Sequence, residues 1–243
     1  MIKAVTFDFW DTLYGSLGAE GVVAARTDAL RRYLLSKGHN FTEDTVRRAY
    51  HHAEERLNYH ARTDWLCPGP DLAMADIFGY LGLAPAQYDT DVLLEQFRTN
   101  ETTKITPLSG VPETLAAMST DLRIGLISDT WLTPGSRLRE RMGQHGLKPF
   151  FAVMVFSDET GFRKPHPRQF ESALSTLGVR PAECVHVGDT ESTDIRGAKA
   201  FGMKAILLDA EYAGQATEAD FAVRTFSEVR AAIMKLKRPA CHG

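Results

Sequence analysis

The amino-acid sequence predicts an α/β fold: a parallel sheet with helices on both faces, a three-layer sandwich, that carries an inserted all-helical domain. Two observations predict it. Short apolar runs rich in β-branched residues alternate with stretches of helical period in the second half of the chain, which is typical of a parallel sheet covered on both faces. After the first such run, a long segment of helical periods without a strand interrupts the alternation.

Several apolar runs are expected to form the strands, and most of them end at a polar residue. They span residues 2–8, 122–128, 151–157, 184–189 and 204–209, while helical periods occupy residues 137–145 and 167–177. Crossovers between parallel strands are right-handed, and ligands collect at the carboxyl ends of the strands. The polar residues at these ends are therefore the first candidates for chemistry.

Residues 15–100 are expected to form a helical domain inserted into a core domain of residues 1–14 and 101–243. Thr42, followed by two acidic residues, is typical of a helix start. The helix that follows has an apolar face made of Val46, Ala49, Tyr50, Ala53 and Leu57. Further helices of the insertion are expected over residues 22–37, 70–81 and 90–98.

Composition and charge restrict the classes of partner. The chain has 243 residues, 28 basic and 31 acidic side chains and a formal net charge of −3, which gives no case for nucleic acid or an anionic membrane as a partner. Its cysteines, Cys67, Cys184 and Cys241, lack CxxC spacing, which favours free thiols in a reducing compartment. The chain shows neither a signal-peptide pattern nor an apolar run near the roughly 18 residues that span a bilayer. We expect a cytoplasmic protein, monomer or homodimer, that acts on a small molecule.

Carboxylates follow two of the expected strands. Asp8 ends the first strand, Asp189 ends a later one, and Asp194 comes five residues after Asp189. A buried carboxylate is costly unless something pairs with it, and several of them at one sheet edge repel each other. A hard divalent cation is the natural partner, and Mg²⁺ binds one or two carboxylates while keeping sites for water and phosphate oxygens. The sequence therefore predicts a Mg²⁺ site at this edge.

Two other segments carry complementary chemistry. Ser128 supplies a hydroxyl, and the turn that it forms with Asp129 can present backbone N–H groups to an anion. Lys164 lies in a stretch stiffened by two prolines and supplies a compact positive charge. Taken singly, such residues are more often turn, cap or surface residues. Together with a carboxylate nucleophile and a metal, they suit phosphoryl transfer through an aspartyl-phosphate.

This ordered set resembles the haloacid dehalogenase superfamily, from Ile2 to about Leu236. The run Phe7-Asp8-Phe9-Trp10-Asp11-Thr12-Leu13 resembles the first motif of that family. The match implies Asp8 as the nucleophile and the backbone carbonyl of Trp10 as a metal ligand. Ser128 matches the phosphate-binding Ser or Thr of the second motif. The helical insertion looks like the bundle-type cap that covers the site and shapes substrate choice in this family.

The later motifs match as well. Lys164, in Lys-Pro-His-Pro, matches the charge-stabilising Lys of the third motif, and Asp189 and Asp194 match the acidic, metal-binding fourth motif. The segment from Ala219 to Val229 resembles the usual last strand and helix. The resemblance implies a Rossmann-like core and Mg²⁺ as cofactor. It also implies a hydrolase, in the first place a phosphatase that acts on a small phosphorylated metabolite.

One position departs from the family pattern. Phosphatases of the family place a second Asp two residues after the nucleophile, which protonates the leaving group and then activates water, and here that residue is Trp10. Losing a general acid or base lowers rates by around 10²–10⁴-fold. Neighbouring side chains of an extended segment point to opposite sides, so Asp11 is expected to face away from Trp10 and to accept a hydrogen bond in a turn. Trp10 is assigned, together with Trp131, to the wall of the substrate pocket.

Three functions stay open, in this order. The first is a phosphatase that acts on a good leaving group or takes a proton from its cap or substrate. The second is a 2-haloacid dehalogenase or phosphonate hydrolase. Haloacid dehalogenases carry an aromatic residue where Trp10 stands, but they need no metal and lack the pair kept here as Gly188-Asp189. The third is a weakly active or non-catalytic binding protein.

A charged face on the long cap helix has two interpretations. Arg48, His52 and Arg56 follow one another at four-residue steps, which places them on one side of the helix. They would either meet an anionic substrate, with a histidine as proton donor, or form a solvated surface beside Glu54 and Glu55. The second interpretation is favoured.

Overall fold

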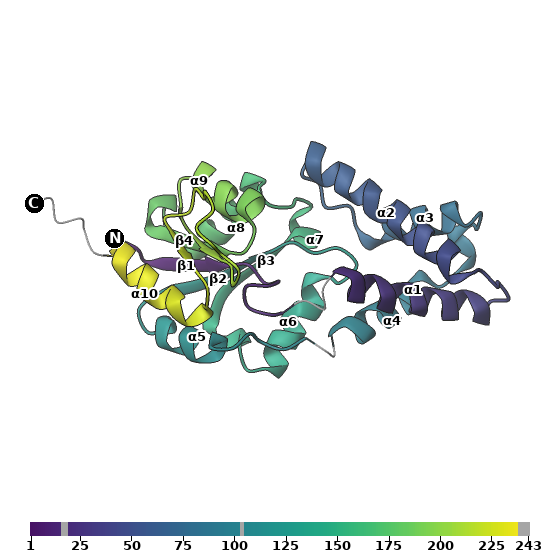
Figure 1. Ribbon diagram of the computed structural model, residues 1–243, viewed down its shortest axis with the longest axis horizontal. Helices are drawn as coiled ribbons and strands as arrows, with labels where there is room; N and C mark the ends of the chain where they lie inside the picture. Colours follow the sequence, from purple (N-terminus) through teal and green to yellow (C-terminus); the bar gives the residue numbers. More distant parts are fainter. Residues whose placement is uncertain (16–18, 103–104, 238–243) are drawn as a thin grey trace, which may run out of the picture.

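The computed structural model describes residues 1–15, 19–102 and 105–237 of the chain. Figure 1 shows an α/β core with a helical part beside it. In the described residues the core holds a six-stranded sheet, all of whose strand pairs are parallel, in the order β3-β2-β1-β4-β5-β6. The strands are β1 (Ala4–Phe7), β2 (Arg123–Ser128), β3 (Phe151–Phe156), β4 (Cys184–Gly188), β5 (Lys204–Leu208) and β6 (Phe221–Val223). The predicted parallel sheet is confirmed, and the first five strands lie within their predicted ranges.

Helices cover both faces of the sheet, as predicted. One face is covered by α5 (Val111–Ser119), α6 (Gly135–Gln144) and α10 (Phe226–Lys237), and the other by α8 (Pro167–Leu177) and α9 (Arg196–Ala200) (Figure 1). Strand side chains alternate between the two layers. In β4, Val185 and Val187 pack with α5 and α10, whereas Cys184 packs with α8 and α9. The fold is therefore a three-layer sandwich.

Short helical pieces connect the longer elements. In the core they are α7 (Ser157–Thr160) and the turns Lys148–Phe150, Pro181–Glu183 and Glu191–Ile195, and in the insertion the turn Pro85–Gln87. The turn at Glu191–Ile195 directly follows β4 and carries Asp194. This turn directs the Asp194 side chain back toward Gly188 at the end of β4.

The long elements described in the insertion that follows β1 are all helices. They are α1 (Ala19–Ser36), α2 (Glu43–Thr63), α3 (Pro70–Tyr80) and α4 (Thr90–Thr102). The predicted start of α2 is confirmed, since Thr42 accepts a hydrogen bond from the backbone N–H of Thr45 at 3.2 Å. The predicted apolar face of α2 is buried from Val46 to Leu57. Because the insertion has a hydrophobic cluster of its own, formed by all four helices, it can hold its shape as a cap.

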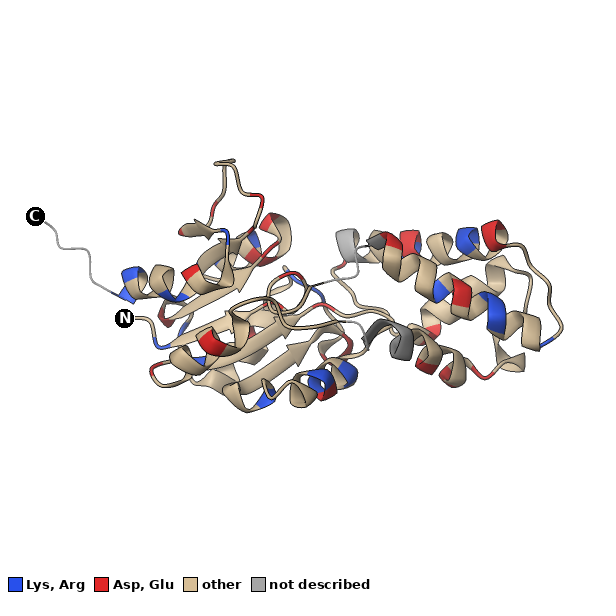
Figure 2. Cartoon of the chain, turned by 60° about the horizontal axis from the view of Figure 1, so that its bottom comes forward, with Lys and Arg blue, Asp and Glu red and all other residues tan. Residues whose placement is uncertain are grey.

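The surface of the cap carries both signs of charge. Figure 2 shows Lys and Arg interspersed with Asp and Glu along the cap helices. Some of them pair: Arg32 binds Asp28 within α1, and Arg47 binds Glu20 across to α1. Within the part of the chain that the structure describes, no helix has both the length and the apolar character required to cross a membrane.

One segment of the core is built into the cap. Leu132, four residues beyond the end of β2, is fully buried and belongs to the hydrophobic cluster of the cap helices. Trp131 packs against the same cluster, with its ring 5.5 Å from that of Tyr50. The loop that begins at Ser128 is therefore anchored in the cap at its far end.

We expect Leu132→Ala to lower the free energy of unfolding by about 2–5 kcal/mol, because it removes a buried side chain that joins cap and core. Urea denaturation measures the change. Leu35→Ala is the matched control, since Leu35 is 54% exposed on α1 and its truncation is expected to change the free energy by about 0.5 kcal/mol or less. Equal effects of the two substitutions would contradict the anchoring role of Leu132.

Candidate active site

Polar residues gather where three neighbouring strands end. Asp8 follows β1, Ser128 ends β2, and Asp189 follows β4. β1 lies between β2 and β4, and the backbone N–H of Asp8 donates to the carbonyl of Val187 at 2.9 Å. The chain order reverses at this point of the sheet, which is where α/β folds form a crevice for ligands.

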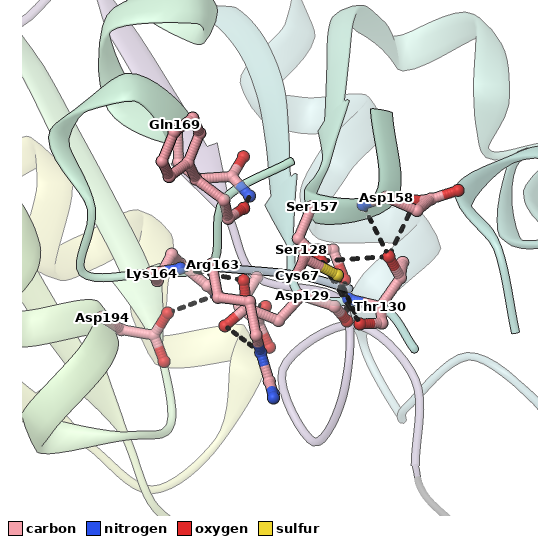
Figure 3. A network of polar contacts seen from close by, with 12 residues as sticks. Cys67, Ser128, Asp129, Thr130, Ser157, Asp158, Arg163, Lys164, Gln169 and Asp194 are labelled. Carbon is pink, nitrogen blue, oxygen red and sulfur yellow. Dashed lines mark hydrogen bonds and ion pairs between the residues drawn. The ribbon is translucent and has the colours of Figure 1, made fainter. Parts of the chain in front are cut away.

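Lys164 reaches this edge from the loop before α8. Its ammonium is buried and donates to Asp8 Oδ1 at 2.5 Å and to Asp194 Oδ1 at 2.6 Å. The backbone N–H of Lys164 donates to Asp129 Oδ1 at 2.9 Å, which ties the lysine loop to the segment after β2. Figure 3 shows Lys164 contacting Asp194 on one side, with Ser128 and Asp129 on the other. The structure thus brings together residues that lie far apart in the sequence.

Burial and mutual charge shift the pKa values in this cluster. Burial raises the pKa of Asp8 well above its usual range, Lys164 opposes that shift, and Asp194 and Asp189 add to it. Burial also acts to raise the pKa of Asp194, but Lys164 and a hydrogen bond from His186 outweigh it, so the pKa falls below its usual range. Burial acts to lower the pKa of Lys164, yet the neighbouring carboxylates raise it. Asp194 and Lys164 therefore form an ion pair.

The third carboxylate completes a set that fits a divalent cation. One oxygen each of Asp8, Asp189 and Asp194 lies within 4.8 Å of the others. Burial, together with the charge of Asp194, raises the pKa of Asp189 to about 6. Three carboxylates meet one ammonium here, so the cluster is short of positive charge. Hard oxygen ligands of this kind are those that Mg²⁺ binds.

Gly188 makes the approach of Asp194 possible. A Cβ atom at this position would lie 2.3 Å from Asp194 Cγ, closer than real Cβ contacts. Asp194 Oδ2 also accepts a hydrogen bond from the backbone N–H of Thr190 at 3.0 Å. The glycine and the turn after β4 therefore fix the carboxylate against the end of the strand.

Ser128 and Asp129 occupy different places in the site. Ser128 is fully buried, and its hydroxyl donates to the carbonyl of Asp129 at 3.3 Å. The Asp129 carboxylate faces the lysine loop, where it accepts from Lys164 N–H and lies 3.8 Å from Arg163 Nε. Burial raises its pKa, and Lys164 and Arg163 oppose that shift. The side chain of Asp129 thus binds the lysine loop. That its backbone N–H donates to a bound anion stays a prediction.

A second polar network holds the segment after Asp129 (Figure 3). The backbone N–H of Thr130 donates to Ser157 Oγ at 2.8 Å, and the Thr130 hydroxyl donates to Asp158 Oδ1 at 2.7 Å. Asp158 also accepts from the backbone N–H of Gly135 at 3.2 Å. The carboxylate at the start of α7 therefore closes the loop between β2 and α6.

The cap contacts this network through the connection between α2 and α3. Cys67 Sγ donates to the carbonyl of Thr130 at 3.4 Å and accepts from Ser157 Oγ at 3.1 Å. The backbone N–H of Cys67 donates to Gly161 O at 3.0 Å, and that of Arg163 donates to Trp65 O at 2.7 Å. A strand-like strip of the cap thus runs along the residues that lead to Lys164. Burial raises the pKa of Cys67, which keeps it a neutral thiol.

The segment after the nucleophile is a tight turn, which corrects the assumption of an extended chain. Asp11 has φ of 53°, in the left-handed region, and the backbone N–H of Tyr14 donates to Phe9 O at 2.9 Å. A turn of this kind is set by tertiary contacts and a local strain that residue alternation does not reveal. Asp11 lines a cavity of about 350 Å³ together with Ser109, Arg224 and Ser227. Trp10 is half-buried, and its ring meets that of Phe9 at 4.9 Å.

The charged residues singled out on α2 have partners on the cap itself. Arg48 pairs with Asp44 at 2.8 Å, and Arg56 pairs with Asp76 of α3 at 3.0 Å. The ring of His52 lies 5.3 Å from that of Tyr80. These contacts match the favoured interpretation of a charged helix surface.

Two residues of the site did not stand out in the sequence: His186 and Asp158. A third, Ser157, appeared only as the polar end of the strand predicted over residues 151–157 and was given no role. His186 lies inside an apolar run and forms a buried contact with Asp194, at 3.1 Å between Nε2 and Oδ1. Sequence patterns give no signal for such a contact, because its partner is set by the turn after β4.

The comparisons with known proteins identify the family of the chain. Residues 2–202 match the model of the haloacid dehalogenase-like hydrolases, which is most of the chain. The protein belongs to this hydrolase family, as the sequence motifs predicted. It is therefore an enzyme by family, with the sheet and cap that the family shares.

Relatives and neighbours include phosphatases and dehalogenases. The chain is 26% identical to a glyceraldehyde 3-phosphate phosphatase of Methanocaldococcus jannaschii, over 98% of this chain and 100% of the relative, and 31% identical to one of Methanothermobacter thermautotrophicus, over 87% of each. The crystal structure of a 2-haloacid dehalogenase from Pseudomonas syringae is 25% identical, with a TM-score of 0.69 over 97% of this chain and 99% of the other. A phosphatase structure from Thermococcus onnurineus shares the fold, at 24% identity and a TM-score of 0.68 over 96% and 98%.

We expect Gly188→Ala to lower the free energy of unfolding by about 1–3 kcal/mol, since the added methyl group forces Asp194 away from the strand end. Gly79→Ala is the matched control. A Cβ at Gly79 meets nothing within 4 Å, and alanine in a helix is up to about 1 kcal/mol more favourable than glycine. Thermal denaturation of the two variants measures the difference. A Gly188→Ala variant as stable as the control would contradict the close approach.

Proposed function

We propose that the protein is a Mg²⁺-dependent phosphatase that acts on a small phosphorylated metabolite through an aspartyl-phosphate on Asp8. One observation carries the proposal: the buried Lys164 ammonium holds the Asp8 carboxylate at 2.5 Å, beside two further carboxylates suited to a divalent cation. The full-length similarity to proteins named glyceraldehyde 3-phosphate phosphatase supports phosphate esters of small metabolites as the substrate class.

The attack on phosphorus is assigned to Asp8. Lys164 engages Oδ1, so Oδ2 is the atom that forms the bond to phosphorus while the bond to the alcohol oxygen breaks. Ser128 and the backbone N–H groups after it are assigned to the phosphoryl oxygens, together with the Lys164 charge. Water then attacks the phosphorus of the aspartyl-phosphate, the bond between Asp8 and phosphorus breaks, and inorganic phosphate is released as the Asp8 carboxylate is restored. One proton of the water passes to the departed alkoxide and gives the alcohol. These donors stabilise the negative charge on the phosphoryl oxygens.

Asp8, Asp189, Asp194 and the backbone carbonyl of Trp10 are the residues proposed to hold Mg²⁺. The bound ion would add positive charge next to the phosphoryl oxygens. The negative charge of the three carboxylates supports this assignment, since one ammonium does not balance them.

The cap is proposed to consist of residues 15–100, with residues 1–14 and 101–243 as the core. Its own hydrophobic cluster and its contacts with the loop after β2 support a role in shaping the substrate pocket. Trp10 and Trp131 are proposed to line that pocket. The cytoplasmic location and the monomeric or homodimeric state stay predictions from the sequence.

A 2-haloacid dehalogenase or phosphonate hydrolase is the second candidate. The aromatic residue Trp10 at the place of the usual second Asp favours it, and so does the similarity to a 2-haloacid dehalogenase structure. The carboxylate cluster of Asp8, Asp189 and Asp194 favours phosphatase chemistry, because the dehalogenases need no metal.

We expect Asp8→Asn to reduce phosphate release by roughly 10⁴-fold or more, because the amide cannot serve as the nucleophile. The assay uses a panel of phosphate esters that includes glyceraldehyde 3-phosphate, with Mg²⁺. Removal of divalent cations by EDTA is expected to abolish the wild-type activity, and added Mg²⁺ to restore it.

Two outcomes of this assay speak against the proposal. Activity of Asp8→Asn near that of the wild type would exclude the covalent mechanism. Halide release from 2-haloacids without Mg²⁺, in the absence of phosphate release, would establish the dehalogenase instead.

We expect Trp10→Asp to raise kcat for alkyl phosphates by up to about 10²-fold, since a carboxylic acid at this place can protonate a poor leaving group. The rate with p-nitrophenyl phosphate is expected to change less, because its phenolate leaves without a proton. Trp10→Asn is the control, because asparagine has nearly the same shape as aspartic acid but no carboxylic acid proton to donate. An equal gain in both variants would show a steric effect, not acid catalysis.

A further inference from the structure

A fully buried histidine lies behind the ion pair of Lys164 and Asp194. His186 is in the middle of β4, where it is the register partner of Thr6 in β1. Its Nε2 lies 3.1 Å from Asp194 Oδ1, and its Nδ1 lies 2.9 Å from the Thr6 hydroxyl. Buried polar groups in the middle of a sheet are costly unless they are bonded, and here each ring nitrogen has a partner.

The protons of this chain of contacts have one consistent arrangement. The Asp194 carboxylate pairs with the Lys164 ammonium at 2.6 Å, so its oxygens accept, and His186 must donate to it from Nε2. His186 is fully buried, and an unbalanced charge on a buried ring is costly. A neutral ring with its proton on Nε2 accepts at Nδ1, so the Thr6 hydroxyl donates to it. The Asp194 carboxylate therefore fixes the proton on Nε2, and the Thr6 hydroxyl satisfies the other ring nitrogen.

Three donors hold the Asp194 carboxylate. Oδ1 accepts from His186 and Lys164, and Oδ2 accepts from the backbone N–H of Thr190. They come from a strand, from the loop before α8 and from the turn after β4. The edge of the Phe170 ring packs on the His186 ring, with centroids 5.5 Å apart and planes at 88°, which limits rotation of the imidazole.

We propose that His186, which is hydrogen-bonded between Asp194 and Thr6, is a positioning residue that orients Asp194 and, through it, the Lys164 ammonium on Asp8. His186 lies behind Asp194 and acts through it, away from the reacting atoms. Without it, Oδ1 of Asp194 loses one of its two donors, so the carboxylate is oriented less firmly and holds the Lys164 ammonium less firmly against the nucleophile. This inference rests on the proposed function, because Lys164 matters for phosphoryl transfer.

Two substitutions of similar length separate a hydrogen-bonding role from simple packing. His186→Gln can place an amide N–H near the position of Nε2, whereas His186→Met fills the space without a donor. We expect His186→Met to lower kcat by about 10–100-fold, as loss of a partner behind a site residue does, with KM changed less than about threefold. His186→Gln is expected to regain most of kcat. Thermal denaturation identifies the variants that fold.

A spectroscopic measurement tests the inference without any activity. Nitrogen-15 spectra of histidine-labelled protein are expected to show one histidine with a protonated Nε2 and an unprotonated Nδ1 at neutral pH, and its signals are identified by their loss in His186→Gln. Thr6→Val is expected to shift the Nδ1 signal, because the hydrogen bond from the threonine hydroxyl is lost, while the proton stays on Nε2.

The failures of the two proposals are distinguishable. If the wild type releases no phosphate from any ester, the proposed function fails, and the spectra still decide the tautomer of His186. If phosphate is released, equal kcat values for folded His186→Met and His186→Gln overturn the positioning role. A proton on Nδ1 of His186 overturns it as well.

Discussion

The burial of several carboxylates around one ammonium is the constraint on which the rest of the site depends. Lys164 lies between Asp8 and Asp194 at 2.5 and 2.6 Å, with little exposure to water. Charges removed from water in this way need excellent geometry and further hydrogen bonds to be tolerated. Three features supply that geometry: Gly188, the N–H donors on Asp194, and the hydrogen bond from the Lys164 backbone to Asp129. The excess of negative charge is also what makes the edge suitable for a cation.

The same loop that leaves β2 at the site also joins the cap. Leu132 is buried among the cap helices, and Arg26 of α1 donates to Thr133 Oγ1 at 3.2 Å. On the other side, Cys67 of the cap contacts Thr130 and Ser157. The loop therefore has partners in both parts of the molecule. A displacement of the cap would have to move or break contacts within a few residues of Ser128, which couples the shape of the cap to the proposed phosphate-binding segment.

Periodicity and strand ends explain how much of this was predictable. The sheet and the cap helices followed from apolar runs, and Asp8, Ser128 and Asp189 followed from the rule that parallel strands share one carboxyl edge. The resemblance assigned Lys164 and Asp194 to the same site, but their contact with each other was not predicted. The role of His186 could not be predicted, because it lies within an apolar run and its partner Thr6 is 180 positions away in the sequence. The left-handed turn at Asp11 is likewise a product of packing, since its sequence neighbours suit an extended segment equally well.

Because of Trp10, the site supports two parts of the proposed reaction unequally: the attack by Asp8 and the protonation of the leaving group. The attack by Asp8 needs a fixed carboxylate, positive charge and donors for the phosphoryl oxygens, and the contacts of Lys164 provide the first two of these. Protonation of the leaving group needs an acid on the opposite side of phosphorus, where the usual second Asp is replaced by an indole that packs edge-on against Phe9. The site thus provides more groups for the attack on phosphorus than for the protonation of the leaving group. In the proposed reaction, such a site favours esters whose alkoxide is a good leaving group, so the chemistry of the leaving group would contribute to substrate choice beside the shape of the cap.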